Sequence, residues 1–99
     1  MSVEKNSLNV PPVAFEDDGS VEILRLWVAN ESLQACLNPQ VFGESAPWGI
    51  ALADAARHVA NAMHETTGKP IEQSILEIRD LFNAELDSPT DQPTGSFVS

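Results

Sequence analysis

The chain has 99 residues, and acidic side chains outnumber basic ones by 15 to 5, which gives a formal net charge of −10. The few cations are scattered along the chain, so neither nucleic acid nor an anionic membrane surface is an expected partner. The single cysteine, Cys36, excludes an internal disulfide and a cysteine-rich zinc site.

The N-terminal region is predicted to combine a flexible lead with an extended segment. Residues 1–10 are polar and are expected to form a flexible lead, and Pro11 with Pro12 favours an extended backbone. An edge strand or a strap over the core is predicted from alternating apolar residues, which are Leu8, Val10, Val13 and Phe15. No apolar run reaches the ~20 residues that span a bilayer. The lead also lacks the apolar stretch of a signal peptide, so the expected location is cytoplasmic.

A β-hairpin is predicted in the next segment. Residues 21–29 are rich in β-branched and aromatic side chains, residues 30–32 resemble a turn, and residues 33–37 form the second strand. The first strand is apolar on both faces, whereas a strand with one wet face should alternate cleanly. We therefore expect both faces to be covered. The interface candidates, on the face opposite Leu24 and Leu26, are Ile23, Arg25 and Trp27.

Two helices are predicted to follow. The first spans residues 45–67, with Ser45 as its cap, Pro47 in its first turn and Gly68 as its stop. The second spans residues 70–86, and the short connection predicts an antiparallel helical hairpin. The predicted buried faces are Trp48, Leu52, Ala55, Val59 and Met63 on the first helix and Ile71, Ile75, Ile78, Phe82 and Leu86 on the second.

The first helix also carries a polar set on one side. Its members are separated by three, four and seven residues, and those in the candidate ligand site are Asp54, Arg57, His58 and Asn61. An acid four residues before a histidine can orient the imidazole or share a metal. The alternative is a solvated helix face with local ion pairs, which is what such charge patterns usually mark.

No catalytic residue, resident metal or cofactor is predicted. His58 and His64 are six residues apart and lie on different sides of the helix, and no HExxH or Cys/His spacing occurs. Cys36 has no activating cation adjacent to it in the sequence, so an inert packing role is favoured. No nucleophile-elbow sequence is present, and isolated glycines cannot build a phosphate-cradling loop.

Several motifs together resemble a known family. They are Pro11-Pro12, the run 22–27, Trp48-Gly49-Ile50, the run 52–58, Ile78-Arg79, Phe82, Glu85 and the run 89–91. They resemble a family of small, about 100-residue proteobacterial proteins with a domain of unknown function. The most specific part is Trp-Gly followed by Leu-Ala-Asp-x-x-Arg-His, and Cys36 and Asn38 depart from the expected polar or basic residues. The resemblance implies a bacterial, cytoplasmic single domain and no particular reaction.

The predicted fold class is α+β: a β-hairpin, with or without an N-terminal extended strand, packed on an antiparallel two-helix hairpin. The domain spans residues 11–86, and residues 87–99 form a flexible tail. A core of this size is marginal, as is a two-stranded sheet, so a homodimer is expected.

Three functions follow in order of preference: a non-enzymatic interaction or regulatory domain with a protein partner, a small-ligand or metal-binding module, and an enzyme with a site shared between subunits.

Overall fold

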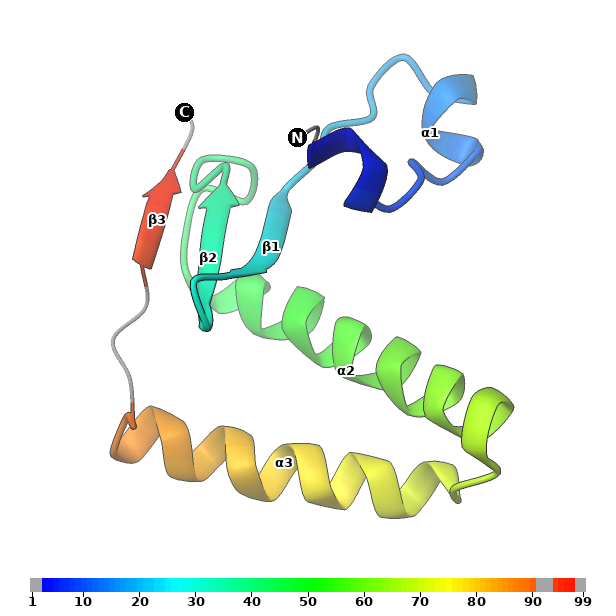
Figure 1. The fold of residues 1–99 in the computed structure, drawn as a ribbon. Helices are drawn as coiled ribbons and strands as arrows, with labels where there is room; N and C mark the ends of the chain where they lie inside the picture. The colour runs from blue at the N-terminus through cyan, green and yellow to red at the C-terminus, as the bar shows by residue number, and fades with distance from the viewer. Residues whose placement is uncertain (1–2, 91–93, 98–99) are drawn as a thin grey trace.

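The computed structural model describes the backbone of residues 3–90 and 94–97 and the side chains of residues 5–90. After a short 3-10 helix come two elements of the N-terminal half, α1 (Val13–Glu16) and the strand β1 (Leu24–Ala29). The remaining elements are β2 (Ser32–Leu37), α2 (Ala46–Thr67), α3 (Ile71–Asp87) and β3 (Thr94–Phe97). The predicted α+β class, with a β-hairpin and a helical hairpin, is confirmed (Figure 1).

The β-hairpin turns through two residues in the left-handed region. β1 and β2 pair antiparallel, from Leu24 opposite Leu37 to Ala29 opposite Ser32. The turn between them consists of Asn30 and Glu31, with φ angles of 54° and 61°. Two positive φ angles in a two-residue loop define a type I′ turn, whose twist matches that of the flanking strands. Asparagine tolerates this conformation, whereas glutamate is strained in it.

The third strand of the sheet comes from the C-terminal segment. β3 lies parallel to β2, so the strand order is β1-β2-β3. This differs from the predicted flexible tail over residues 87–99, of which 91–93 and 98–99 lie outside the described residues. Serine, threonine and glycine give no apolar alternation, so a strand that pairs through its backbone leaves no signal in the sequence.

The N-terminal segment does not form the extended strand that the sequence allowed. Val13–Glu16 is helical, and the Ala14 and Phe15 N–H groups donate to the Pro11 and Pro12 carbonyls at 2.9 and 3.1 Å. A proline at the start of a helix loses no hydrogen bond and has a preset helical φ. The two prolines therefore start a helical turn here.

The two long helices begin and end within one residue of their predicted limits. Pro47 lies in the first turn of α2, but Ser45 makes no side-chain capping bond, contrary to expectation, and its backbone is itself helical. Gly68 ends α2 with a φ of 78° and donates its N–H to the His64 carbonyl at 2.9 Å. Lys69 forms an ion pair with Glu77 that braces the connection to α3.

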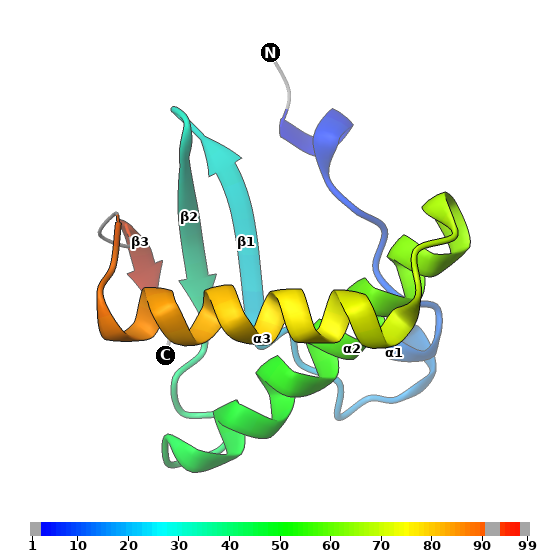
Figure 2. The ribbon, with the colours of Figure 1, turned by 90° about the horizontal axis from the view of Figure 1, so that it is seen from below.

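The helical hairpin is tight only at its connected end. The axes of α2 and α3 diverge from the connection (Figure 1), and the two buried residues of the described chain are Ala60 and Ser74, at 0% and 4% exposure. The sheet extends away from the helices (Figure 2), and no described strand has a Cα within 8 Å of a Cα of α2 or α3. The described part of a single chain thus buries almost no core.

The strained turn gives a stability prediction. Replacing Glu31 with glycine should stabilise the hairpin by about 1 kcal/mol, because glycine adopts a positive φ without steric cost. Thermal or urea unfolding measures the change. Asn30→Gly is the control and should change stability by only a few tenths of a kcal/mol, since asparagine already tolerates this region. A loss of stability in Glu31→Gly would contradict the assigned turn.

Candidate functional site

The predicted ligand-binding residues lie on the exposed surface of α2. Asp54, Arg57, His58 and Asn61 are all exposed, and none of their side chains makes a hydrogen bond or ion pair within the described chain. Among the described residues, no group of three or more histidine, cysteine, aspartate or glutamate side chains is placed to hold a metal ion. The structure thus brings no second element to these four residues, and their role stays a prediction.

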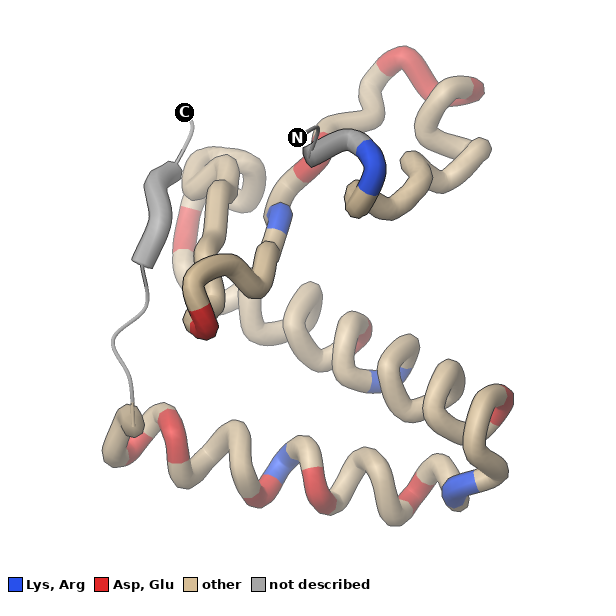
Figure 3. The backbone as a smooth tube through the Cα atoms, viewed as in Figure 1, with Lys and Arg blue, Asp and Glu red and all other residues tan. Residues whose placement is uncertain are grey.

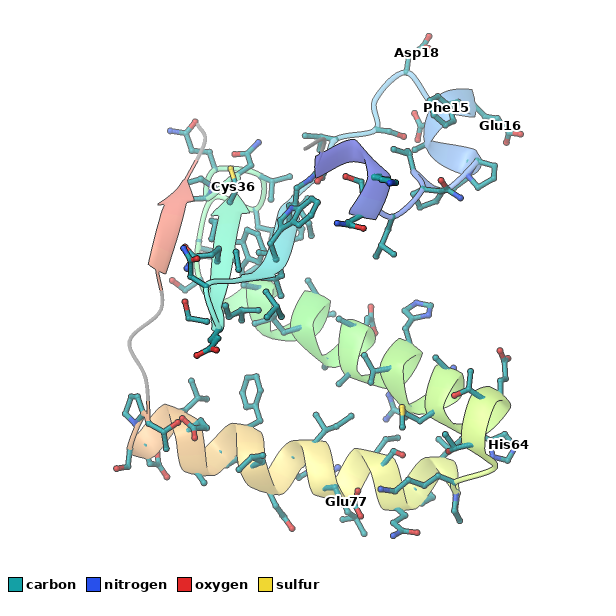
Figure 4. All side chains as sticks on the ribbon, in the orientation of Figure 1. Phe15, Glu16, Asp18, Cys36, His64 and Glu77 are labelled. Atoms are coloured by element: carbon teal, nitrogen blue, oxygen red, sulfur yellow. The ribbon has the colours of Figure 1, made fainter. Side chains whose placement is uncertain are left out.

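The remaining reactive side chains are also isolated from one another. Cys36 is a half-buried free thiol near the end of β2, and His64 lies far from it at the end of α2 (Figure 4). The His64 Nδ1 atom lies 3.0 Å from the Lys69 carbonyl oxygen, a local contact at the helix end. Arg25 lies directly opposite Cys36 on β1, and its guanidinium is held by Glu22. Among the described residues, neither Cys36 nor His64 has a hydrogen bond to a side-chain base or acid of the kind that nucleophilic or acid–base catalysis uses.

Large apolar side chains are exposed where the helices diverge. On α3, Ile71, Ile75 and Ile78 are half-buried near the connection, whereas Phe82 and Leu86 on the same stripe are 45% and 69% exposed. One helical face therefore passes from covered to uncovered along its length. Because sequence periodicity predicted a continuous buried stripe, the uncovered half is a surface without a partner among the described residues.

The apolar stripe of α2 behaves in the same way. Trp48 is half-buried and packs edge-on against Phe42, with ring centroids 5.2 Å apart. The residues that follow it on the predicted buried face are instead exposed: Leu52, Val59 and Met63. Their predicted burial is not met within one chain. The physical reason is that no described strand approaches α2 and that the packing of α3 against α2 buries only Ala60 of this helix.

One face of the β-hairpin is entirely apolar. The strand register places Leu24, Leu26 and Val28 opposite three apolar residues of β2, which are Leu37, Ala35 and Leu33. Directly opposed residues share a face of the sheet, so all six side chains lie together. Leu26 is 51% exposed and Val28 is 79% exposed. A face of this composition is normally packed against other apolar surface.

The predicted interface residues lie on the opposite face or just before it. Trp27 and Ile23 are half-buried, and Arg25 is exposed. The Arg25 guanidinium donates to both carboxylate oxygens of Glu22, at 2.6 and 2.9 Å. This hydrogen bonding lowers the pKa of Glu22. The structure thus neutralises the charge beside Trp27, while the interface role of these residues stays a prediction.

An N-terminal arm, residues 6–22, stands away from the rest of the chain. Leu8 is 94% exposed and Phe15 is 77% exposed. Figure 4 shows Phe15 with Glu16 and Asp18 at the outer end of this arm, well away from α2 and α3. Between the arm and β1 lies an open groove of about 1050 Å³ that both segments line. The arm therefore leaves the outer side of β1 accessible.

The surface area summarises this open architecture. The chain exposes 8332 Å², whereas a folded monomer of this mass exposes about 5,500 Å². Its radius of gyration is 15.3 Å, compared with about 13 Å for a compact domain of this length. The excess is about 2,800 Å², several times the ~800 Å² that each partner buries in a standard protein interface.

Charge is distributed unevenly over this surface. Figure 3 shows acidic residues along the helices and turns. The two strands of the hairpin, with sequences LRLWVA and SLQACL, contain no acidic residue. Since the chain carries a net charge of −10, two copies repel each other at most orientations. The two hairpin strands therefore add no negative charge to that repulsion, although Glu31 lies in the turn between them.

Comparison with known proteins assigns a family but no activity. The model of a domain of unknown function, DUF5076, matches residues 7–90. The chain belongs to this family. None of the curated proteins compared matches the chain. A solved structure named "putative pyruvate dehydrogenase" from the photosynthetic bacterium Rhodopseudomonas palustrus CGA009 is similar, with 29% identity and a TM-score of 0.69. The match covers 88% of this chain and 89% of that one.

Sequence reasoning about this DUF5076 chain missed the residues that make its surface unusual. Leu81 and Leu86 of α3, like Leu8 and Phe15 of the arm, are largely exposed. The signal available in the sequence was collective, because a domain this small builds only a marginal core. Which residues stay uncovered depends on how far α2, α3 and the sheet stand apart. Local sequence patterns do not encode that separation.

The chain leaving α3 is tied to Glu85, which gives a pH prediction for this DUF5076 domain. The Glu85 carboxylate accepts hydrogen bonds from the Thr90 N–H and hydroxyl, both at 2.9 Å, and these bonds lower the pKa of Glu85. A carboxyl whose pKa is lower in the folded state stabilises that state above its unfolded pKa. This stabilisation is lost as the pH falls through the folded value, so acid should loosen the Glu85–Thr90 tie and the β2–β3 pairing beyond it.

Amide hydrogen exchange measures this effect. The N–H groups of Ala35 and Leu37 face β3, so their protection factors should fall at acid pH and also in Glu85→Ala at neutral pH. Protection of Cys36, which faces β1, should change less. Glu65→Ala is a matched control because the Glu65 side chain is exposed on α2 and makes no hydrogen bond or ion pair within the described residues. Equal protection in Glu85→Ala and the parent chain would contradict the prediction.

Proposed function

We propose that this chain is a non-enzymatic interaction domain that works as a homo-oligomer, most simply a homodimer. The observation that carries the proposal is the missing core: the described chain buries only Ala60 and Ser74. Ordering a residue costs about 1–2 kcal/mol of backbone entropy, which a folded chain offsets mainly by burying apolar surface. One copy of this chain buries too little for that, so a partner must supply the rest.

The extent of the exposed surface favours a permanent partner. The excess of about 2,800 Å² per chain amounts to about 5,600 Å² for two copies, which matches obligate complexes, burying 2,000–5,000 Å² or more in total, better than transient ones. Apolar residues are exposed on α2, α3, the hairpin and the arm, so no single small patch accounts for the excess.

A second copy of the chain is the simplest such partner. Most soluble oligomers are symmetric homo-oligomers, and a two-fold axis presents the same surface on both sides. Each copy then offers the apolar faces that the other copy lacks. We also propose that the assembled oligomer binds a further protein. That interaction would use the outer, polar surface that remains exposed after assembly. The half-buried free thiol of Cys36 is compatible with a reducing compartment, and we propose the cytoplasm.

The name of the similar solved structure does not change this proposal. A dehydrogenase acting on pyruvate needs reacting side chains or a cofactor site that places the substrate. The described side chains bring together no nucleophile with a base and no group suited to a metal ion. That comparison therefore supports the fold alone. The dehydrogenase activity in its name belongs to that protein, and we do not propose it for this chain.

Dilution tests the proposed assembly directly. Analytical ultracentrifugation at tens of micromolar should give the mass of a dimer or a larger homo-oligomer. The thermal midpoint followed by circular dichroism should rise with protein concentration, because association is coupled to folding. A folded monomer with a concentration-independent midpoint would refute the proposal.

A pair of matched variants on α3 tests which surface is covered. Phe82→Ala should destabilise the assembly by about 3 kcal/mol per chain, since an aromatic ring that becomes buried on association is lost. Leu76→Ala is the control, because Leu76 is exposed among the polar residues of α3 and should cost no more than about 0.5 kcal/mol. Chemical unfolding at fixed concentration measures both. Equal, small losses would show that the Phe82 surface stays in solvent.

A further inference from the structure

The hairpin register fixes which backbone groups of β1 point away from β2. The Asn38 N–H donates to the Ile23 carbonyl at 3.0 Å, and these residues continue the ladder directly opposite each other. A directly opposed pair that exchanges a hydrogen bond is a closely bonded pair, and such pairs alternate along an antiparallel ladder. Arg25, Trp27 and Ala29 therefore bond to β2, which agrees with the two-residue type I′ turn.

The other three residues of β1 present their backbone groups to the open edge. The N–H and C=O groups of Leu24, Leu26 and Val28 face away from β2, and β1 is an outer strand of the sheet. No described backbone group bonds to them there. The groove of about 1050 Å³ runs along this edge and separates it from the arm.

We propose that the outer edge of β1 pairs antiparallel with β1 of a second copy, forming one continuous sheet across a two-fold axis; this inference rests on the homo-oligomer proposed above. The register that uses every free group places Leu26 opposite Leu26 of the second copy and Leu24 opposite its Val28. Each of these pairs exchanges two backbone hydrogen bonds. The backbone N–H and C=O groups that are unpaired at the β1 edge of one chain thereby become hydrogen-bonded in the dimer.

Side chains and charge favour the same arrangement. The residues whose backbones face the edge, Leu24, Leu26 and Val28, also share the apolar face of the hairpin. Pairing two edges joins the two apolar faces into one surface that is large enough to pack against helices. β1 carries no acidic residue, and Arg25 is already paired with Glu22. Two chains of net charge −10 can thus approach along this edge with little local repulsion.

A second copy fits this edge better than an unrelated extended peptide. Backbone pairing alone accepts any strand, and specificity comes from the side chains beside it. The neighbouring side chains here are leucine and valine in a pattern that is complementary to itself under the two-fold rotation. The ~2,800 Å² of excess surface also requires far more contact than one added strand provides, and a whole second chain supplies it.

A charge-swap experiment tests the pairing. Leu26→Lys and Leu26→Glu are prepared separately, one of them labelled with 15N so that native mass spectrometry distinguishes the two chains. Each variant alone places like charges opposite each other at the two-fold axis, and homodimerisation should weaken about tenfold or more. Mixing the two variants should restore a mixed dimer in preference to either homodimer. If a single variant fails to fold, recovery of its circular dichroism on mixing provides the same readout.

The matched control is the same swap at Ala35. Ala35 lies directly opposite Leu26 on β2 and on the same face, but one strand further from the edge. In the proposed dimer the two Ala35 residues are three strand spacings apart, about 14 Å, so Ala35→Lys and Ala35→Glu should show no preference for mixed pairs. A preference at Ala35 equal to that at Leu26 would overturn the edge pairing.

Failure of this inference is distinguishable from failure of the proposed function. A parent chain that is dimeric, with Leu26→Lys remaining equally dimeric, refutes the β1 edge and leaves the homo-oligomer standing. If the parent chain is dimeric but mixing Leu26→Lys with Leu26→Glu yields no mixed dimer, the β1 edge is likewise refuted and the homo-oligomer still stands. A parent chain that is monomeric and folded at all concentrations refutes both proposals together.

Discussion

The structure depends on one constraint: the chain cannot cover its own apolar surface. α2 and α3 touch closely only at their connected end, where the small residues Ala60 and Ser74 allow the helices to approach. Beyond that contact the helices diverge, and the stripe that is half-buried at Ile75 is open at Phe82. Since folding entropy must be offset by burial, order in one chain is tied to the presence of another surface.

Electrostatics oppose this association and restrict where it can occur. A net charge of −10 keeps separate copies apart over most of their surface. The hairpin strands are the exception, because their one charge, on Arg25, is balanced by Glu22. Long-range repulsion thus disfavours non-specific clustering, while the hairpin strands, which carry no acidic residue, permit one defined approach.

Local sequence patterns predicted the helices and the hairpin, but they did not predict how these elements pack against one another. Pro47 and Gly68 determined the limits of α2, and Asn30 marked the turn, because each acts through its own backbone preference. Pro11 and Pro12 were misleading, since proline suits both an extended segment and the first turn of a helix. The burial of Leu52 and Val59 was predicted from periodicity, which identifies an apolar face but not the chain that covers it. The candidate ligand residues all lie in α2, but nothing in their spacing indicates a second group, and their binding role stays a prediction.

The turn links local conformation to assembly. Because the loop has two residues, Ala29 and Ser32 form a bonded pair, and every second residue back along β1 bonds to β2. That alternation leaves Leu24, Leu26 and Val28 with outward backbone groups and, by the same pleat, a common apolar face. A loop one residue longer would change the register and separate these two properties. The two-residue turn, with Glu31 in its strained conformation, therefore places the free backbone groups and the apolar side chains on the same three residues. Pairing with a second copy requires this coincidence.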